Sequence, residues 1–202
     1  GAVDQLVGWI VRVESGGNAR ARNPLSSATG LGQFISSTWL RMIRTYRPDP
    51  SSGLSEREIL ELRYDPTLSR EMIRNLAREG EAYLVRRGHA ITAGRLYLAH
   101  FLGMEGAATV LAADPDADVI DVVGAGVIRA NPFLACRKVR YVVDWAERTM
   151  SSARRRGRAP VRAKNVTVPA AVRPATPQGP DPAFVAYREA VLGLFAAKGT
   201  SP

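Results

Sequence analysis

Apolar residues recur at helical spacing through the first 150 residues, and no alternating strand pattern exceeds about five residues. The first predicted helix runs from Asp4, its expected N-cap, to Glu14. One face of this helix carries Leu6, Val7, Ile10 and Val13. Residues 16–32 are rich in Gly, Asn, Ser and Pro and predict a loop, and a second helix is expected over residues 33–46.

Capping signals divide the remaining residues of this region into further helices. Ser55 and Glu58 have the spacing of a capping box, and Asp65-Pro66 caps a long helix that Gly88 ends. Thr92 is expected to open the next helix. Further helical segments are predicted at residues 92–102, 106–113, 119–128 and 139–148. The pattern therefore predicts an all-α domain over residues 1–150.

The last 52 residues differ in composition from the rest of the chain. Residues 151–180 are rich in Arg, Pro and Ala and have few large side chains, which predicts an extended or disordered linker. Residues 182–198 carry apolar side chains at helical spacing and predict a short amphipathic helix that docks on the domain or binds a protein partner. Residues 151–202 therefore form a C-terminal extension in this interpretation.

Most of the positive charge belongs to this extension. The net charge is +9, and residues 1–150 contain 19 basic and 17 acidic side chains, so residues 151–202 contribute +7. The extension lacks the interleaved aromatic residues of a nucleic-acid-binding segment, and no apolar run is long enough to span a membrane. The lone Cys136 is expected to be a buried structural thiol.

Glu14 is the first candidate for chemistry. It ends a mostly apolar helix and is followed at once by Ser15-Gly16-Gly17-Asn18. Burial and the negative end of the helix dipole both disfavour the charged form of a carboxyl group there, which raises its pKa. A raised pKa suits a general acid near neutral pH. The alternative for a single Glu at this place is a solvated residue at a helix end.

The segment from Glu14 to Leu40 resembles the catalytic core of the soluble lytic transglycosylases, which are lysozyme-like enzymes related to goose-type lysozyme. Three blocks carry the resemblance in the family's order, over roughly residues 3–148. They are Glu14-Ser15 with Gly30-Leu31-Gly32-Gln33 and Thr38-Trp39, then Arg63-Tyr64-Asp65-Pro66, then Tyr97 to Gly103. The resemblance implies a lysozyme-like helical domain that cleaves bacterial peptidoglycan in the periplasm or outside the cell. No signal peptide is visible in this chain.

The implied reaction breaks the β-1,4 bond between N-acetylmuramic acid and N-acetylglucosamine and gives a 1,6-anhydro product. Most glycosidases use two carboxylates, but no Asp or Glu follows Glu14 until Asp49. One carboxyl group suffices when it acts first as acid and then as base, because the 6-hydroxyl of the sugar replaces water. A remote second carboxylate supplied by the fold stays open, with Asp65, Glu56 and Glu58 as candidates.

The resemblance also implies residues that contact substrate. These candidates are Ser26, Ser27, Gly30, Gln33, Tyr97 and His100. Gly30 and Gly32 are expected to let the backbone approach the sugar closely. The serines and Gln33 are otherwise polar residues that cap the loop. His100 stands where the family usually has a Tyr, so it is either a hydrogen-bond donor in the site or a packed core histidine.

Two other functions stay open at this stage. A goose-type muramidase would hydrolyse the same bond with water, and an inactive wall-binding scaffold would serve a secretion, flagellar or phage machine. The expected partner in each case is the peptidoglycan glycan strand. The sequence has no phosphate-binding loop and no spacing of His, Cys, Asp or Glu that predicts a metal site, so no cofactor or metal is expected.

Overall fold

All regular secondary structure in the computed structural model, which describes residues 2–24 and 26–158, is helical. Long helices form the centre: α1 (Ala2–Ser15), α5 (Pro66–Arg86), α6 (Ala93–Ala112) and α9 (Val139–Arg158). Helix α6 packs against both α5 and α9, and α1 also contacts α5 and α9. The prediction of an all-α fold is thus confirmed for the described residues.

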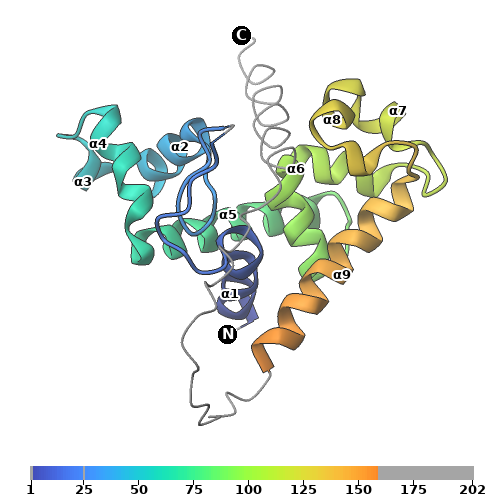
Figure 1. Cartoon of the computed structure of the whole chain (residues 1–202), viewed down its shortest axis with the longest axis horizontal. Coiled ribbons are helices and arrows are strands. Elements are labelled where there is room, and N and C mark those ends of the chain that lie inside the picture. Colours follow the sequence, from blue (N-terminus) through green and yellow to red (C-terminus); the bar gives the residue numbers. More distant parts are fainter. Residues whose placement is uncertain (1, 25, 159–202) are drawn as a thin grey trace, which may run out of the picture.

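Shorter helices lie on two sides of this centre (Figure 1). One group contains α2 (Ser36–Tyr46), α3 (Pro48–Ser51), α4 (Glu56–Glu61) and the 3-10 turn η1 (Leu62–Tyr64). The other contains α7 (Val119–Val123), α8 (Ala125–Ala130) and the 3-10 turn η2 (Pro132–Leu134). The loop between α1 and α2 lies beside the first group, so residues 16–24 and 26–35 lie between α1 and the α2–α4 side.

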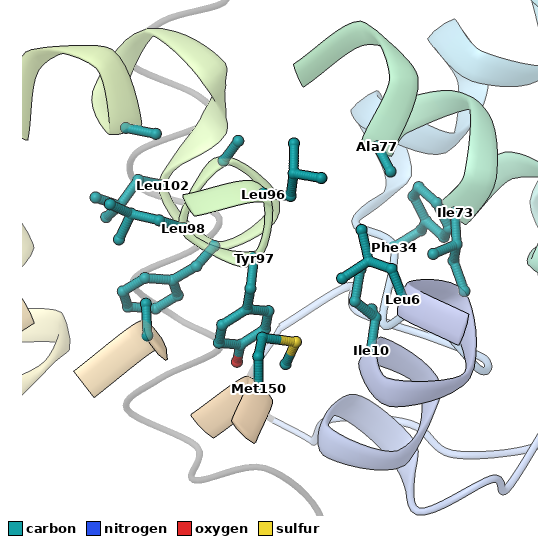
Figure 2. Close-up of a cluster of buried hydrophobic side chains, with 14 of the residues drawn as sticks. Leu6, Ile10, Phe34, Ile73, Ala77, Leu96, Tyr97, Leu98, Leu102 and Met150 are labelled. Carbon is teal, nitrogen blue, oxygen red and sulfur yellow. The ribbon is translucent and has the colours of Figure 1, made fainter. Parts of the chain in front are cut away.

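One hydrophobic core joins the central helices (Figure 2). Ile10 of α1, Ile73 of α5, Tyr97 of α6 and Met150 of α9 all belong to it, together with Phe34 from the loop. None of these five side chains is more than 1% exposed. Burial of a large apolar side chain stabilises a fold by roughly 1.5–3 kcal/mol. The loop is therefore fixed to the helices through its own apolar side chain.

The predicted caps of α4, α5 and α6 are present, but Asp4, the expected N-cap of the first helix, lies within the first turn of α1, which begins at Ala2. Ser55 and Glu58 form both halves of the capping box of α4. Asp65 accepts a hydrogen bond from the backbone N–H three residues later at the start of α5, and Thr92 does the same at the start of α6. Gly88 follows α5 with a φ of +78°. These local signals were sufficient because each cap uses atoms only a few residues apart.

Other helix boundaries differ from the prediction. Gln33 has a φ of +49° and lies in the loop, so α2 begins three residues later at Ser36. Helix α6 runs through both predicted segments with a kink at Gly103, where φ is +76°. The predicted helix at residues 119–128 is broken at Gly124, where φ is +85°, and forms α7 and α8 instead.

The prediction of a linker from Ser151 is wrong for its first eight residues, because α9 continues to Arg158. Val142, Ala146, Met150 and Ala153 continue one buried stripe along this helix. The carbonyl of Ala153 also accepts a hydrogen bond from Arg12 of α1 at 2.7 Å. Packing against α1 thus extends the helix into the Arg-rich segment. Residues 159–202, which include the predicted helix at 182–198, lie outside the described residues.

The expectation of a buried structural thiol is also wrong, because Cys136 is exposed. It lies between η2 and α9 with a φ of +56°, in a turn where its neighbours Arg137 and Lys138 are exposed as well. In this exposed turn the Cys136 side chain is not part of the core. Separately, no helix in the described part of the chain is both long and apolar enough to cross a membrane.

Candidate functional site

Glu14 lies in the last turn of α1, where the chain reverses sharply. Gly16 and Gly17 adopt φ values of +62° and +86°, and the Gly16 N–H closes the helix on the carbonyl of Arg12 at 3.2 Å. The Ser15 hydroxyl accepts a hydrogen bond from the N–H of Gly17 at 3.3 Å. The glycines are needed because residues with a side chain rarely adopt these φ values. This turn fixes the Glu14 carboxyl at the negative end of the α1 dipole.

The Glu14 carboxyl is inside the protein, with 0% of its side chain exposed. Its Oε1 atom lies 3.7 Å from Nε2 of His100, whose side chain is 3% exposed. The structure therefore brings the predicted acid and one predicted substrate-contact residue together from α1 and α6.

The hydrogen-bond partner of His100 fixes which ring nitrogen carries a proton. Nε2 lies 3.3 Å from the carbonyl oxygen of Gly32. Because a carbonyl oxygen can only accept, Nε2 is the protonated nitrogen when this bond forms. The same nitrogen lies 3.7 Å from Oε1 of Glu14. His100 thus connects the loop block that contains Gly32 to the acid at the end of α1.

Aromatic rings hold His100 in place. Tyr97 lies one helical turn earlier on the same face of α6, and its ring stacks on His100 at 6.5 Å between centroids with an interplanar angle of 16°. Phe34 meets the imidazole edge-on at 6.2 Å. Trp145 of α9 contacts Tyr97 from 5.7 Å. Figure 2 shows the Tyr97 hydroxyl directed toward Met150. The structure thus places Tyr97 directly behind His100.

Gln33 connects distant parts of the loop after α1. Its side-chain Nε2 donates to the carbonyls of Ala21 at 3.2 Å and Gly30 at 2.9 Å. The residue is 1% exposed. The N–H of Gly30 also donates to Ala21 at 2.8 Å. These bonds explain the positive φ of Gln33, and they use its amide N–H groups to hold the loop closed.

Arg63 belongs to the second resemblance block, but the sequence did not predict its structural role. Its guanidinium is buried and donates to the carbonyls of Ser27 at 2.6 Å, Phe34 at 3.1 Å and Leu60 at 3.0 Å. Its own carbonyl accepts the Ser69 hydroxyl at 2.9 Å. The side chain of Arg63 therefore joins the loop to α4, and its backbone carbonyl adds a contact with α5. Its presence in the second resemblance block was the only signal in the sequence.

The two glycines of the Gly-Leu-Gly-Gln block are explained by internal packing. A Cβ on Gly30 would lie 2.2 Å from the carbonyl oxygen of Arg63, and its φ is +81°. A Cβ on Gly32 would lie 2.8 Å from atoms of Ile73 and of Phe34. The close backbone approach expected at these glycines is thus made to the protein's own Arg63 and Ile73. Gly30, one of the predicted substrate-contact residues, lies against η1.

The predicted serines make bonds within the loop. The Ser26 hydroxyl accepts from the N–H of Ala28 at 3.1 Å. The Ser27 hydroxyl accepts from the N–H of Ser36 at 3.1 Å, at the first residue of α2. Both side chains are half-buried. Their observed contacts match the capping role that was considered for them.

The three candidates for a second carboxylate are all exposed and have other partners. Asp65 caps α5 by accepting from a backbone N–H at 2.7 Å. Glu58 accepts from the backbone N–H of Ser55 at 2.8 Å, and this bond lowers the pKa of Glu58 below its usual value. Glu56 pairs with Arg44 at 2.8 Å. These contacts place the three carboxylates in helix caps and in a surface ion pair.

The described residues contain no group of three or more His, Cys, Asp or Glu side chains arranged to hold a metal ion. No protein-family model matches the chain, and a search of curated proteins finds no similar sequence.

Proposed function

We propose that this protein is a lytic transglycosylase that cleaves the β-1,4 bond between N-acetylmuramic acid and N-acetylglucosamine in peptidoglycan, outside the cytoplasm. The observation that carries the proposal is the pairing of Glu14 with His100 at 3.7 Å beneath the loop that bears Gly32 and Gln33. The choice of peptidoglycan as substrate rests on the resemblance of the three sequence blocks to the soluble lytic transglycosylases. The lysozyme-like character of the helical domain belongs to the same proposal.

In the proposed reaction, Glu14 donates a proton to the glycosidic oxygen while the bond between that oxygen and C1 of the muramic acid breaks. The positive charge that develops at C1 is then removed by attack of the sugar's own 6-hydroxyl oxygen. The hydroxyl proton passes to the Glu14 carboxylate, which restores the acid. The product is a 1,6-anhydro ring, and no water is consumed. The capping and surface roles of Asp65, Glu56 and Glu58 support this route over hydrolysis.

His100 would act on the Glu14 carboxylate between the two proton transfers. Its Nε2 lies 3.7 Å from Oε1 of Glu14, and the carbonyl of Gly32 orients its N–H. An N–H dipole stabilises a neighbouring carboxylate, so it lowers the cost of the ionised intermediate state of the acid. Tyr97 stacks behind the imidazole and keeps its plane fixed. His100 is a positioning residue in this scheme.

One observation favours a second candidate, the non-catalytic wall-binding scaffold. The Glu14 side chain is 0% exposed, so a sugar reaches it only if the segments packed over it move. A scaffold needs no such movement and would keep Glu14 as a buried partner of His100. The two candidates differ in what Glu14 does, which makes its replacement the decisive test.

The test compares Glu14→Gln with the matched variant Glu61→Gln, which changes an exposed Glu at the end of α4. The release of soluble fragments from purified peptidoglycan is measured for each full-length protein. Loss of a general acid lowers the rate by about 10²–10⁴-fold, and Glu61→Gln is expected to leave it unchanged. Equal release of fragments by the unmodified protein and both variants, or release by none of the three, would exclude the catalytic proposal.

A further inference from the structure

A groove of about 390 Å³ lies between α1 and α9, on a part of the surface that the proposed reaction does not use. Its wall includes Arg12 from α1 and Arg148 and Arg156 from α9. Trp145, Thr149 and Ser152 of α9 complete the part of the lining that matters here. Two helices that are far apart in sequence thus direct three guanidinium groups to one recess.

The charge in this groove is not neutralised by the protein itself. No acidic side chain is among the residues that line it. Within the described part of the chain, none of its three arginines forms an ion pair with a carboxylate. Arg12 donates through Nη1 to the carbonyl of Ala153, and Arg148 lies 5.9 Å from the ring of Tyr141. Other surface arginines do pair, as Arg41 does with Glu79 at 2.8 Å.

Favourable interaction with the helix dipole accounts for only part of this arrangement. Cations are stabilised near the C-terminus of a helix, within its last turn. Arg156 satisfies that condition in α9, which ends at Arg158. Arg12 satisfies it in α1, which ends at Ser15. Arg148 lies more than two turns before the end of α9, so the dipole does not explain its position. Arg148 therefore adds a third positive charge to the groove that neither helix end explains.

The groove also has an aromatic surface against which the uncharged part of a ligand can pack. The indole of Trp145 is half-buried and stands beside the arginines, and the hydroxyls of Thr149 and Ser152 lie one and two turns along. Planar guanidinium groups bind carboxylates and phosphates through paired hydrogen bonds. A flat aromatic side chain packs against a ring or an apolar chain. These two features suit a ligand that has an oxyanion on a compact organic body.

We propose that this arginine groove is a binding site for an oxyanion, either a carboxylate or a phosphate, whose attached body packs against Trp145. The site is separate from Glu14 and does not depend on the proposed activity. A carboxylate ligand would correspond to an acidic peptide or acidic sugar, and a phosphate ligand to a phosphate-bearing polymer or small molecule.

The test uses the full-length chain with benzoate and phenyl phosphate as probes, and benzyl alcohol as the uncharged control. Binding is followed by nuclear magnetic resonance through the indole N–H signal of Trp145, assigned with the variant Trp145→Phe. The variant Arg148→Gln/Arg156→Gln removes two exposed guanidinium groups of the groove. Arg154→Gln is the matched control, because it removes a charge from the same helix outside the groove.

We expect at least one charged probe to shift the Trp145 signal and benzyl alcohol not to. The double variant should weaken that binding at least about tenfold, since each lost guanidinium removes a hydrogen-bond donor that carries a charge. Arg154→Gln should change it less than about twofold. Saturation by benzoate alone assigns a carboxylate ligand, and saturation by phenyl phosphate alone assigns a phosphate ligand. Absence of binding by both probes, or equal weakening in the control variant, would overturn the proposal. Equal melting temperatures of the variants confirm that they are folded.

Discussion

The loop after α1 and the segment that contains α7 and α8 both lack long helices, yet they are held in different ways. The loop is held by two buried side chains, Gln33 within it and Arg63 of η1, which donate to backbone carbonyls. Around α7 and α8, exposed ion pairs join Lys138 to Asp118 and Arg140 to Asp116. The buried contacts surround the proposed acid, and the exposed ones do not.

This difference has an energetic meaning. A buried carbonyl that loses its donor costs roughly 1–3 kcal/mol, because water cannot replace the bond. An exposed ion pair that loses one partner is replaced by water at little cost. The loop is therefore specified by polar groups that have to be satisfied together. The α7–α8 segment is specified mainly by its backbone bonds, such as that from the N–H of Val119 to the carbonyl of Arg137 at 2.9 Å.

The largest effect on stability is expected for Arg63→Met. The change leaves the carbonyls of Ser27, Phe34 and Leu60 without their guanidinium donor. We expect the free energy of unfolding to fall by about 3 kcal/mol or more, measured by urea denaturation. Arg57→Met on α4 is the control, because Arg57 is exposed and should change stability by less than about 0.5 kcal/mol. Similar losses in both variants would contradict the claim that buried donors hold the loop.

The second prediction concerns Gly30→Ala, with Gly17→Ala as its matched control. Both glycines have positive φ, +81° and +86°, but a Cβ on Gly17 meets nothing within 4 Å. Gly17→Ala should therefore cost only the backbone strain, about 1–2 kcal/mol. Gly30→Ala adds the clash with the carbonyl of Arg63 and should cost about 1–3 kcal/mol more. Equal values for the two variants in urea denaturation would show that packing against η1 does not require a glycine.

The smallest effect is expected for Lys138→Gln in the α7–α8 region. The hydrogen bond to Asp118 raises the pKa of Lys138 above its ordinary value of 10.5. A raised pKa contributes stability that is complete below 10.5 and is lost only as the pH rises through the folded-state pKa. The melting temperature should therefore change by less than about 2 °C, and by the same amount at pH 6 and pH 9. A difference that varies between these two pH values would show that another group controls this segment.

The sequence predicted those features that depend on neighbouring residues. The caps at Ser55, Asp65 and Thr92 each use a backbone N–H three residues away, so their residue types were sufficient. The position of Glu14 at the end of α1 was predicted for the same reason. The extension of α9 past Ser151 was missed because it depends on packing against α1.

The candidate site shows the same division. Glu14 and His100 were identified separately from their motifs, but their approach to 3.7 Å depends on how α1 packs with α6 and the loop. The positive φ of Gln33 depends on side-chain bonds to Ala21 and Gly30, which no helix or loop propensity contains. The hydrogen bond from Arg63 to the carbonyl of Ser27 joins residues 36 positions apart. Such contacts are determined by the fold as a whole.

The central claim is that Glu14 serves as both acid and base without an activated water molecule. The most direct test is to digest purified peptidoglycan in water enriched in ¹⁸O and to measure the masses of the released fragments. The account predicts fragments that end in 1,6-anhydro-muramic acid and contain no ¹⁸O from the cleavage. Fragments with a reducing end that carries one ¹⁸O atom would contradict it and would identify a hydrolase.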